Sequence, residues 1–198
     1  MSHPFQLVAG HVALDFANTL DFRFDPSRTV DLLPSYDRFV DFALQSGLIT
    51  PAHAARLRKQ SGDSSRRAAL KSAIEIREAL ELLFRSVVSG KAPGKASLEV
   101  LNRFLARSKE HESLVWRNSE FVREYGDLSE RPDGPIWPLL DAAIELLTSP
   151  ARSRIRECKE PSCKWLFLDH SKNLSRRWCD MRICGNRTKV RKFRERRA

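Results

Sequence analysis

The chain has 198 residues, which is enough for one large domain or two small ones with a real hydrophobic core. Hydrophobic residues make up 41% and charged residues 30%, a composition that excludes a disordered protein. The formal net charge is +10, and it is concentrated at one end: residues 151–198 hold 16 Lys and Arg against 5 Asp and Glu, whereas residues 1–150 hold 19 against 20.

The sequence indicates neither a membrane segment nor a signal peptide. No apolar run reaches the ~18–20 residues of a membrane helix, and the best candidate, 136–147, is interrupted by Pro138, Asp141 and Glu145. The first 25 residues lack a basic stretch followed by an apolar one. We therefore expect a cytoplasmic protein that does not contact membranes. In that compartment, clustered cysteines favour metal binding over disulfides.

The hydrophobic pattern of residues 1–150 predicts a mainly helical domain with a small sheet, so the expected fold class is α+β. A short strand is expected up to Ala9, and a hairpin is expected with strands over 113–116 and 121–125. Helices are predicted from about residue 11 and over 35–45, 51–59, 65–89, 96–109 and 137–149.

Two groups of polar residues stand out in this domain. Arg77 and Glu81 lie four residues apart within an apolar helical stripe, which indicates either a buried ion pair or polar anchors in a ligand pocket. A second group lies near the N-terminus, where His11, Asp15 and Asn18 share one helical face and Arg23 follows them. These residues either satisfy backbone groups or bind a small molecule. With Arg77, the candidate ligand-binding residues are His11, Asp15, Asn18, Arg23 and Arg77.

All four cysteines lie within 27 residues, in the pattern Cys158-x4-Cys163-x15-Cys179-x4-Cys184. Two close pairs of thiols separated by a short segment suit a tetrahedral four-thiolate zinc site. We expect one structural Zn²⁺ per chain. Two disulfides, an iron–sulfur cluster and unpaired buried thiols are the alternatives.

The segment between the two cysteine pairs predicts a β-hairpin held by the metal. Residues 165–168 form an apolar strand-like run, and the chain turns near Asn173 and returns to Cys179. A basic helix is expected from Asn186 to about residue 197, with Val190 and Phe193 packed on the hairpin. A module of some 40 residues has too small a core to fold alone, so zinc binding should supply its stability.

The dense positive charge of this module indicates binding to a phosphate backbone. The alternative is a solvated basic tail, or one that contacts acidic parts of its own N-terminal domain. Trp178 either stacks on a base or packs on the zinc core. The candidate phosphate-binding residues are Arg176, Arg177, Arg187, Lys189, Arg191, Lys192 and Arg196.

At Cys184-Gly185-Asn186-Arg187 the sequence resembles the CGNR zinc finger family. The resemblance extends over the other cysteines, residues 165–169, Ser171, residues 176–178, Met181 and Lys189. The opening residues 10–20 are similar to the start of the ABATE domain, which usually precedes this finger. Within the motif, Gly185 is expected to allow a sharp turn past the metal, and Asn186 is expected to cap the last helix.

The resemblance implies a bacterial stress-induced transcription regulator, in which residues 151–198 bind DNA and residues 1–150 sense a signal. The expected function is therefore that of a zinc-containing DNA-binding regulator that responds to a small molecule or to stress. An RNA- or protein-binding zinc module is one alternative, and an enzyme acting on a small molecule is another. We expect no enzyme, because no nucleophile–base signature is visible and four thiolates leave no open zinc position. One finger is a small footprint on DNA, which makes a homodimer plausible.

Overall fold

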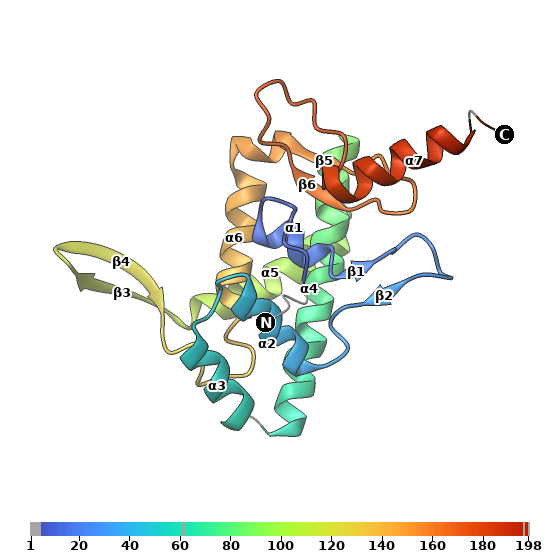
Figure 1. Cartoon of the computed structure of the whole chain (residues 1–198). Coiled ribbons are helices and arrows are strands. Elements are labelled where there is room, and N and C mark those ends of the chain that lie inside the picture. The colour runs from blue at the N-terminus through green and yellow to red at the C-terminus, as the bar shows by residue number, and fades with distance from the viewer. Residues whose placement is uncertain (1–4, 61, 196, 198) are drawn as a thin grey trace.

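The computed structural model describes residues 5–60, 62–195 and 197, and it confirms the α+β class. The described residues are mostly helical and form three separate two-stranded antiparallel sheets (Figure 1). The long helix α4 (Asp63–Ser89) runs through the body of the molecule, and the other elements surround it. No helix among the described residues is long and apolar enough to cross a membrane.

The helices of the N-terminal part follow the predicted hydrophobic periods. They are α1 (Val12–Ala17), α2 (Tyr36–Gln45), α3 (Pro51–Gln60), α4, α5 (Lys95–Lys109) and α6 (Ile136–Thr148). On α4, a stripe that includes Ala73, Ile76 and Leu80 is buried completely. The helix ends where Gly90 takes a left-handed conformation with a φ of 67°, which a residue without a Cβ adopts at little cost.

The predicted hairpin is present as β3 (Glu112–Arg117) and β4 (Glu120–Tyr125), which pair in full register. The strand expected up to Ala9 is wrong. The first strand is instead β1 (Leu20–Asp21), which pairs with β2 (Val30–Asp31). The backbone around Ala9 bonds to other groups: its N–H donates to the Asp15 carboxylate, and its carbonyl accepts from the N–H of Leu168.

The C-terminal part consists of short elements: the 3₁₀ helix η1 (Pro150–Arg154), β5 (Ile155–Glu157), β6 (Leu166–Leu168), the π-helical turn η2 (Met181–Gly185) and α7 (Asn186–Glu195). We predicted that the strand over 165–168 pairs with the chain returning to Cys179, and this pairing is wrong. β6 pairs with β5, which precedes the first cysteine. After β6 the chain cannot continue as a strand, because the buried Asp169 carboxylate accepts hydrogen bonds from the N–H groups of Ser171 and Arg176 and so ties the segment into a loop.

The N-terminal and C-terminal parts share one hydrophobic core rather than two. β6 contacts α1, β5 contacts α4, and η1 continues from α6. Leu166 and Phe167 of β6 are buried. The zinc module is therefore built onto the helical body and is not suspended from it by a linker.

Candidate metal centre and nucleic-acid interface

The four cysteines come together in the buried centre of the C-terminal part. Their sulfur atoms all lie within 4.8 Å of one another, and the Sγ of Cys179 is 3.6 Å from that of Cys163 and from that of Cys184. Four sulfurs placed at about 2.3 Å around Zn²⁺ would be about 3.8 Å apart, so the cluster fits a tetrahedral zinc ion.

These observations, together with the spacing of the cysteines, support one structural zinc in this protein. Sulfur atoms take all four coordination positions, so the ion holds the fold together and has no open position for a substrate. Two segments position the sulfurs. Cys158 and Cys163 lie in the loop between β5 and β6, whereas Cys179 and Cys184 lie before and after the start of η2.

Glu160 connects the first cysteine loop to α7. Its side chain is only 1% exposed, and its carboxylate accepts hydrogen bonds from Arg191 at 2.6 Å and from the Thr188 hydroxyl at 2.7 Å. Burial alone would raise the pKa of Glu160, but the bonds from Arg191 and Thr188 outweigh it and hold the pKa below its usual range. The Trp178 indole N–H donates to the same Thr188 hydroxyl, so Trp178 lies beside this network.

The second cysteine loop begins at a cap that the sequence analysis did not identify. The Asp180 carboxylate accepts from the N–H groups of Arg182 and Ile183 and so caps η2, whereas the Asn186 amide donates to the Arg182 carbonyl. Asn186 is thus not the cap that we expected. The φ of Gly185 is not positive either, so a sharp turn does not explain this glycine. A Cβ at this position would overlap the Met181 side chain, which packs against Gly185 in this structure.

The side of α7 that faces the zinc centre is polar, and the expected apolar contact is wrong. Val190 and Phe193 are 50% and 55% exposed, while Thr188 is buried and Arg191 is half-buried against Glu160. The face with Thr188 and Arg191 and the face with Val190 and Phe193 cannot both turn toward the zinc centre. The bonds to Glu160 turn the face with Thr188 and Arg191 inward. The apolar pair therefore lies on the outer side of a basic helix.

Among the predicted phosphate-binding residues, Arg176, Arg187 and Arg191 form hydrogen bonds inside the protein, and the bond of Arg187 is long, at 3.5 Å to the Ser162 hydroxyl. The Arg176 guanidinium donates to the carbonyls of Val8, Trp178 and Cys179, and that of Arg191 binds Glu160. Arg176 and Arg191 thus stabilise the module, which accounts for them without a phosphate.

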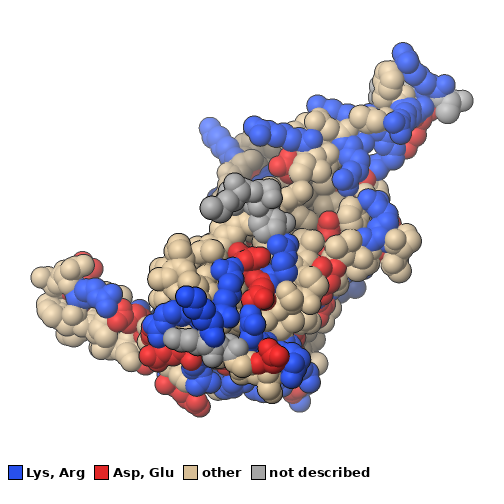
Figure 2. Space-filling model, turned by 60° about the horizontal axis from the view of Figure 1, so that its bottom comes forward, with Lys and Arg blue, Asp and Glu red and all other residues tan. Residues whose placement is uncertain are grey.

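Apart from Arg176 and Arg191, the candidates lie on the surface or outside the described part of the chain. Arg177, Arg187 and Lys189 are exposed. Lys192 lies on α7, but its side chain is not described, and Arg196 lies outside the described residues. On η2 and α7, the exposed cations that the sequence analysis did not single out are Arg182 and Arg194. Figure 2 shows Lys and Arg side chains along the projecting end of the molecule that contains α7.

The predicted ligand-binding residues of the N-terminal part bond to protein groups. His11 caps α1 by accepting from the N–H of Ala13, and Asp15 accepts from the N–H of Ala9 at 2.9 Å. Burial raises the pKa of Asp15 to about 6, although the hydrogen bond from the backbone N–H of Ala9 acts in the opposite direction.

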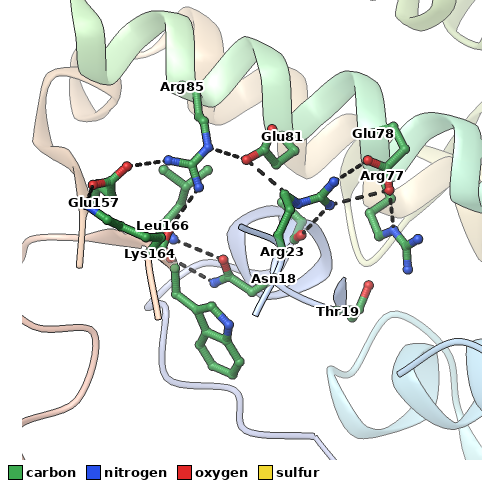
Figure 3. Close-up of polar contacts among 12 residues, drawn as sticks. Asn18, Thr19, Arg23, Arg77, Glu78, Glu81, Arg85, Glu157, Lys164 and Leu166 are labelled. Atoms are coloured by element: carbon green, nitrogen blue, oxygen red, sulfur yellow. Dashed lines mark hydrogen bonds and ion pairs between the residues drawn. The ribbon is translucent and has the colours of Figure 1, made fainter. Parts of the chain in front are cut away.

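Asn18 joins the helical body to the zinc module. Its side-chain amide donates to the carbonyl of Leu166 at 2.8 Å, and its side-chain oxygen accepts from the N–H of the same residue at 2.9 Å (Figure 3). Asn18 therefore bonds to the free edge of β6 as another strand would. Beside it, the Trp165 indole N–H donates to the Asp21 carboxylate at 2.9 Å. Asn18 and the Asp21–Trp165 bond form the docking contact between the two parts.

Arg77 and Glu81 do not form the ion pair that their spacing indicates. Arg77 binds Asp31 through two nitrogens, at 2.7 and 2.9 Å, and also contacts Glu78. Glu81 instead lies between Arg23 and Arg85 (Figure 3). Arg77 and Glu81 thus each have an opposite partner from another element or another turn.

Arg85 carries this ion-pair network from α4 to the zinc module. Its guanidinium binds Glu81 on its own helix, Glu157 on β5 and the carbonyl of Lys164, which follows Cys163 (Figure 3). Sequence reasoning missed Arg85 because its partners are 72 and 79 residues away. The same holds for Glu160, whose only local signal was an acidic side chain among many basic ones.

Fold and site together define a zinc-finger protein in which a helical domain holds a four-cysteine centre and a basic helix. Residues 10–150 match the ABATE family, whose description is "Putative stress-induced transcription regulator", and residues 154–197 match the CGNR zinc finger. The first match covers more than half of the chain, so this protein belongs to the ABATE family and carries a C-terminal CGNR zinc finger. A search of curated proteins found no match to this chain.

Proposed function

We propose that this protein is a DNA-binding transcription regulator whose zinc finger contacts the phosphate backbone of duplex DNA through α7. The exposure of the cations on this helix carries the proposal. Arg187, Lys189 and Arg194 are exposed on an element that projects from the body (Figure 1). Buried or half-buried side chains on its inner face hold the helix in place, so the cations are displayed by a fixed support rather than by a loose tail.

A second group of cations lies elsewhere on the C-terminal part. A groove beside the first cysteine loop is lined by Arg152, Arg156, Lys159 and Arg177, next to apolar side chains of α4. Nearby acids are engaged already: Glu157 binds Arg85 and Lys164. Phosphates are favoured where cations outnumber acidic neighbours, which makes both α7 and this groove suitable for a polyanion.

The outer face of α7 also suits contact with bases. Asn186, Val190 and Phe193 follow one another at helical spacings of four and three, and all three are exposed. An α-helix fits the major groove of B-DNA, where apolar side chains such as those of Val190 and Phe193 contact thymine methyl groups. We propose this face as the one that turns toward the bases. RNA and protein partners remain the alternatives that the experiment below separates.

A small-molecule site at His11, Asp15, Asn18, Arg23 and Arg77 is not part of this proposal. Each of these side chains bonds to protein groups, which accounts for its position. For residues 1–150 we propose a different role, which is to present the finger through the docking contact and the Arg85 bonds. A signal that acts on the regulator would reach α7 through these contacts.

The test is the salt dependence of binding by the zinc-loaded full chain. Fluorescence anisotropy with a labelled duplex should give a binding constant whose logarithm falls linearly with the logarithm of salt concentration. Replacing Arg187 and Lys189 together by Ala should lower the slope by about 2, because each phosphate contact contributes about one released counterion. Lys95→Ala is the matched control, since Lys95 is an exposed cation on α5, and it should leave the slope unchanged.

Three results would contradict the proposal. These are absence of binding at 50 mM salt, a salt slope that the double variant shares with the wild type, and tighter competition by duplex RNA than by duplex DNA. The last result would favour an RNA-binding module.

A further inference from the structure

The hairpin β3–β4 projects from the body on the side away from α7 (Figure 1). Its base is tied to the helical part by the Tyr125 hydroxyl, which donates to Asp141 at 2.7 Å, and by Lys109, which binds Glu112 at 2.8 Å. Beyond these contacts the hairpin is surrounded by solvent. Its outer surface in Figure 2 is mostly neutral, in contrast to the basic end of the molecule.

Three large apolar side chains of this hairpin are largely exposed. Leu114, Trp116 and Phe121 are 67%, 63% and 72% exposed. The rings of Trp116 and Phe121 contact each other edge to face, with centroids 4.7 Å apart. Such an arrangement leaves costly apolar surface in water, which is typical of an interaction site.

The strand register places these three side chains on one face. Trp116 is opposite Phe121 and Leu114 is opposite Arg123, so the four residues lie on the same side of the ribbon. Val115 and Val122 lie opposite each other on the other side. We call the side with Leu114, Trp116 and Phe121 the aromatic face.

We infer that the aromatic face is a docking surface for the same face of a second copy of this chain. A two-stranded ribbon is marginal in water by itself and needs further strands or a packed face. A second identical hairpin supplies that face through a two-fold axis, in which the same patch of both copies is used and a contact of one residue with another is repeated in reverse.

The charge distribution favours a second copy over a nucleic acid. Residues 112–125 contain two Arg and three Glu, so the hairpin is nearly neutral in a chain of net charge +10. A polyanion would not be attracted to it. Two such hairpins would not repel each other, and because α7 lies at the other side of the molecule, pairing would keep the two basic helices apart.

The exposed area sets the expected strength of this dimer. Trp and Phe side chains present about 150–250 Å² each when fully exposed, so the aromatic face offers roughly 300–400 Å² per copy. Joining two such faces would bury roughly 700 Å², which is below the range of tight interfaces. We therefore expect reversible association in the micromolar range, and not a permanent dimer.

Sedimentation velocity of the zinc-loaded full chain from 5 to 200 µM tests this inference without any nucleic acid. The wild type should shift from monomer toward dimer over this range. A variant with Trp116→Ser and Phe121→Ser should remain a monomer at 200 µM. The control Val122→Ser removes an apolar side chain from the opposite face of the same hairpin and should associate like the wild type.

Two outcomes would overturn the inference. The first is a wild type that stays monomeric at 200 µM, which would leave the aromatic face for another protein. The second is a variant with Trp116→Ser and Phe121→Ser that still forms dimers. Equal zinc content and equal circular dichroism among the three proteins would show that the substitutions did not unfold the chain. The result is independent of the proposed DNA binding, because no nucleic acid is present.

Discussion

At the scale of single residues, polar side chains inside the protein determine how the zinc module is held. Asn18 provides both a donor and an acceptor to one peptide unit of β6, which no apolar side chain could do. Both Asn18 and Leu166 are buried, so water cannot replace these two bonds. The residue type and its place at the end of α1 are thus explained by structure.

Replacing Asn18 by Ala should therefore destabilise the protein strongly. Two buried backbone groups of Leu166 would lose their partners, which costs about 1–3 kcal/mol for each group. We expect the free energy of unfolding in urea to fall by about 2–4 kcal/mol. Asn102→Ala, at an exposed position on α5, is the matched control and should change it by less than about 0.5 kcal/mol. An equal, small effect of both substitutions would show that Asn18 is not a docking residue.

At the scale of elements, α7 is oriented by one buried carboxylate in the first cysteine loop. Glu160 fixes the helix through Thr188 and Arg191, and zinc fixes its beginning through Cys184. A metal site by itself would hold only one end of the helix. The Glu160 bonds determine which face of α7 turns outward, and hence which cations are displayed.

We expect Glu160→Gln to loosen α7 while the zinc centre remains. The amide keeps the size of the side chain but removes the charge that binds Arg191, so amide hydrogens of α7 should exchange at least about threefold faster, which corresponds to about 0.7 kcal/mol. The control Glu195→Gln removes an exposed carboxylate whose contact with the same arginine is 3.8 Å long, and it should leave exchange unchanged. Mass spectrometry of exchanged peptides measures both. Identical exchange in the two variants would refute this role of Glu160.

Local patterns predict elements here, but they do not predict partners. The helices α2 to α6 follow from apolar residues at helical spacing and from the glycine that ends α4, all of which are neighbours in sequence. The four zinc ligands were predictable for the same reason. The pairing of β6 with β5, the bond of Arg77 to Asp31 and the exposure of Phe193 each depend on contacts that arise only in the folded chain.

At the scale of the whole molecule, the shared core makes the two parts interdependent. Residues of β6 are buried together with α1, and Cys158 and Cys184 belong to the same hydrophobic cluster as the helices. The division of the chain at residue 150 remains a prediction about function. In packing, the structure has one unit, because removing the zinc module would expose part of the core of the other.

Removal of zinc should consequently lower the stability of the entire chain. We expect one cooperative thermal transition both for the wild type treated with a metal chelator and for the Cys163→Ser variant. Its midpoint should lie at least about 10 °C below that of the zinc-loaded wild type, because several kcal/mol of metal-binding free energy are lost. Circular dichroism at 222 nm follows the helices of the N-terminal part, and restored zinc should reverse the change for the wild type only. Unaltered melting of the helical signal would contradict a shared core.

The length of α4 has a consequence for how this protein could be controlled. As 27 helical residues it spans roughly 40 Å, with Arg77 near its middle and Arg85 close to its C-terminal end. Because Arg85 binds Glu157 and the backbone beside Cys163, a tilt of this rod cannot occur without moving the metal loop. A change of tilt in the helical part would thus displace the zinc loop directly, without a separate hinge between the two.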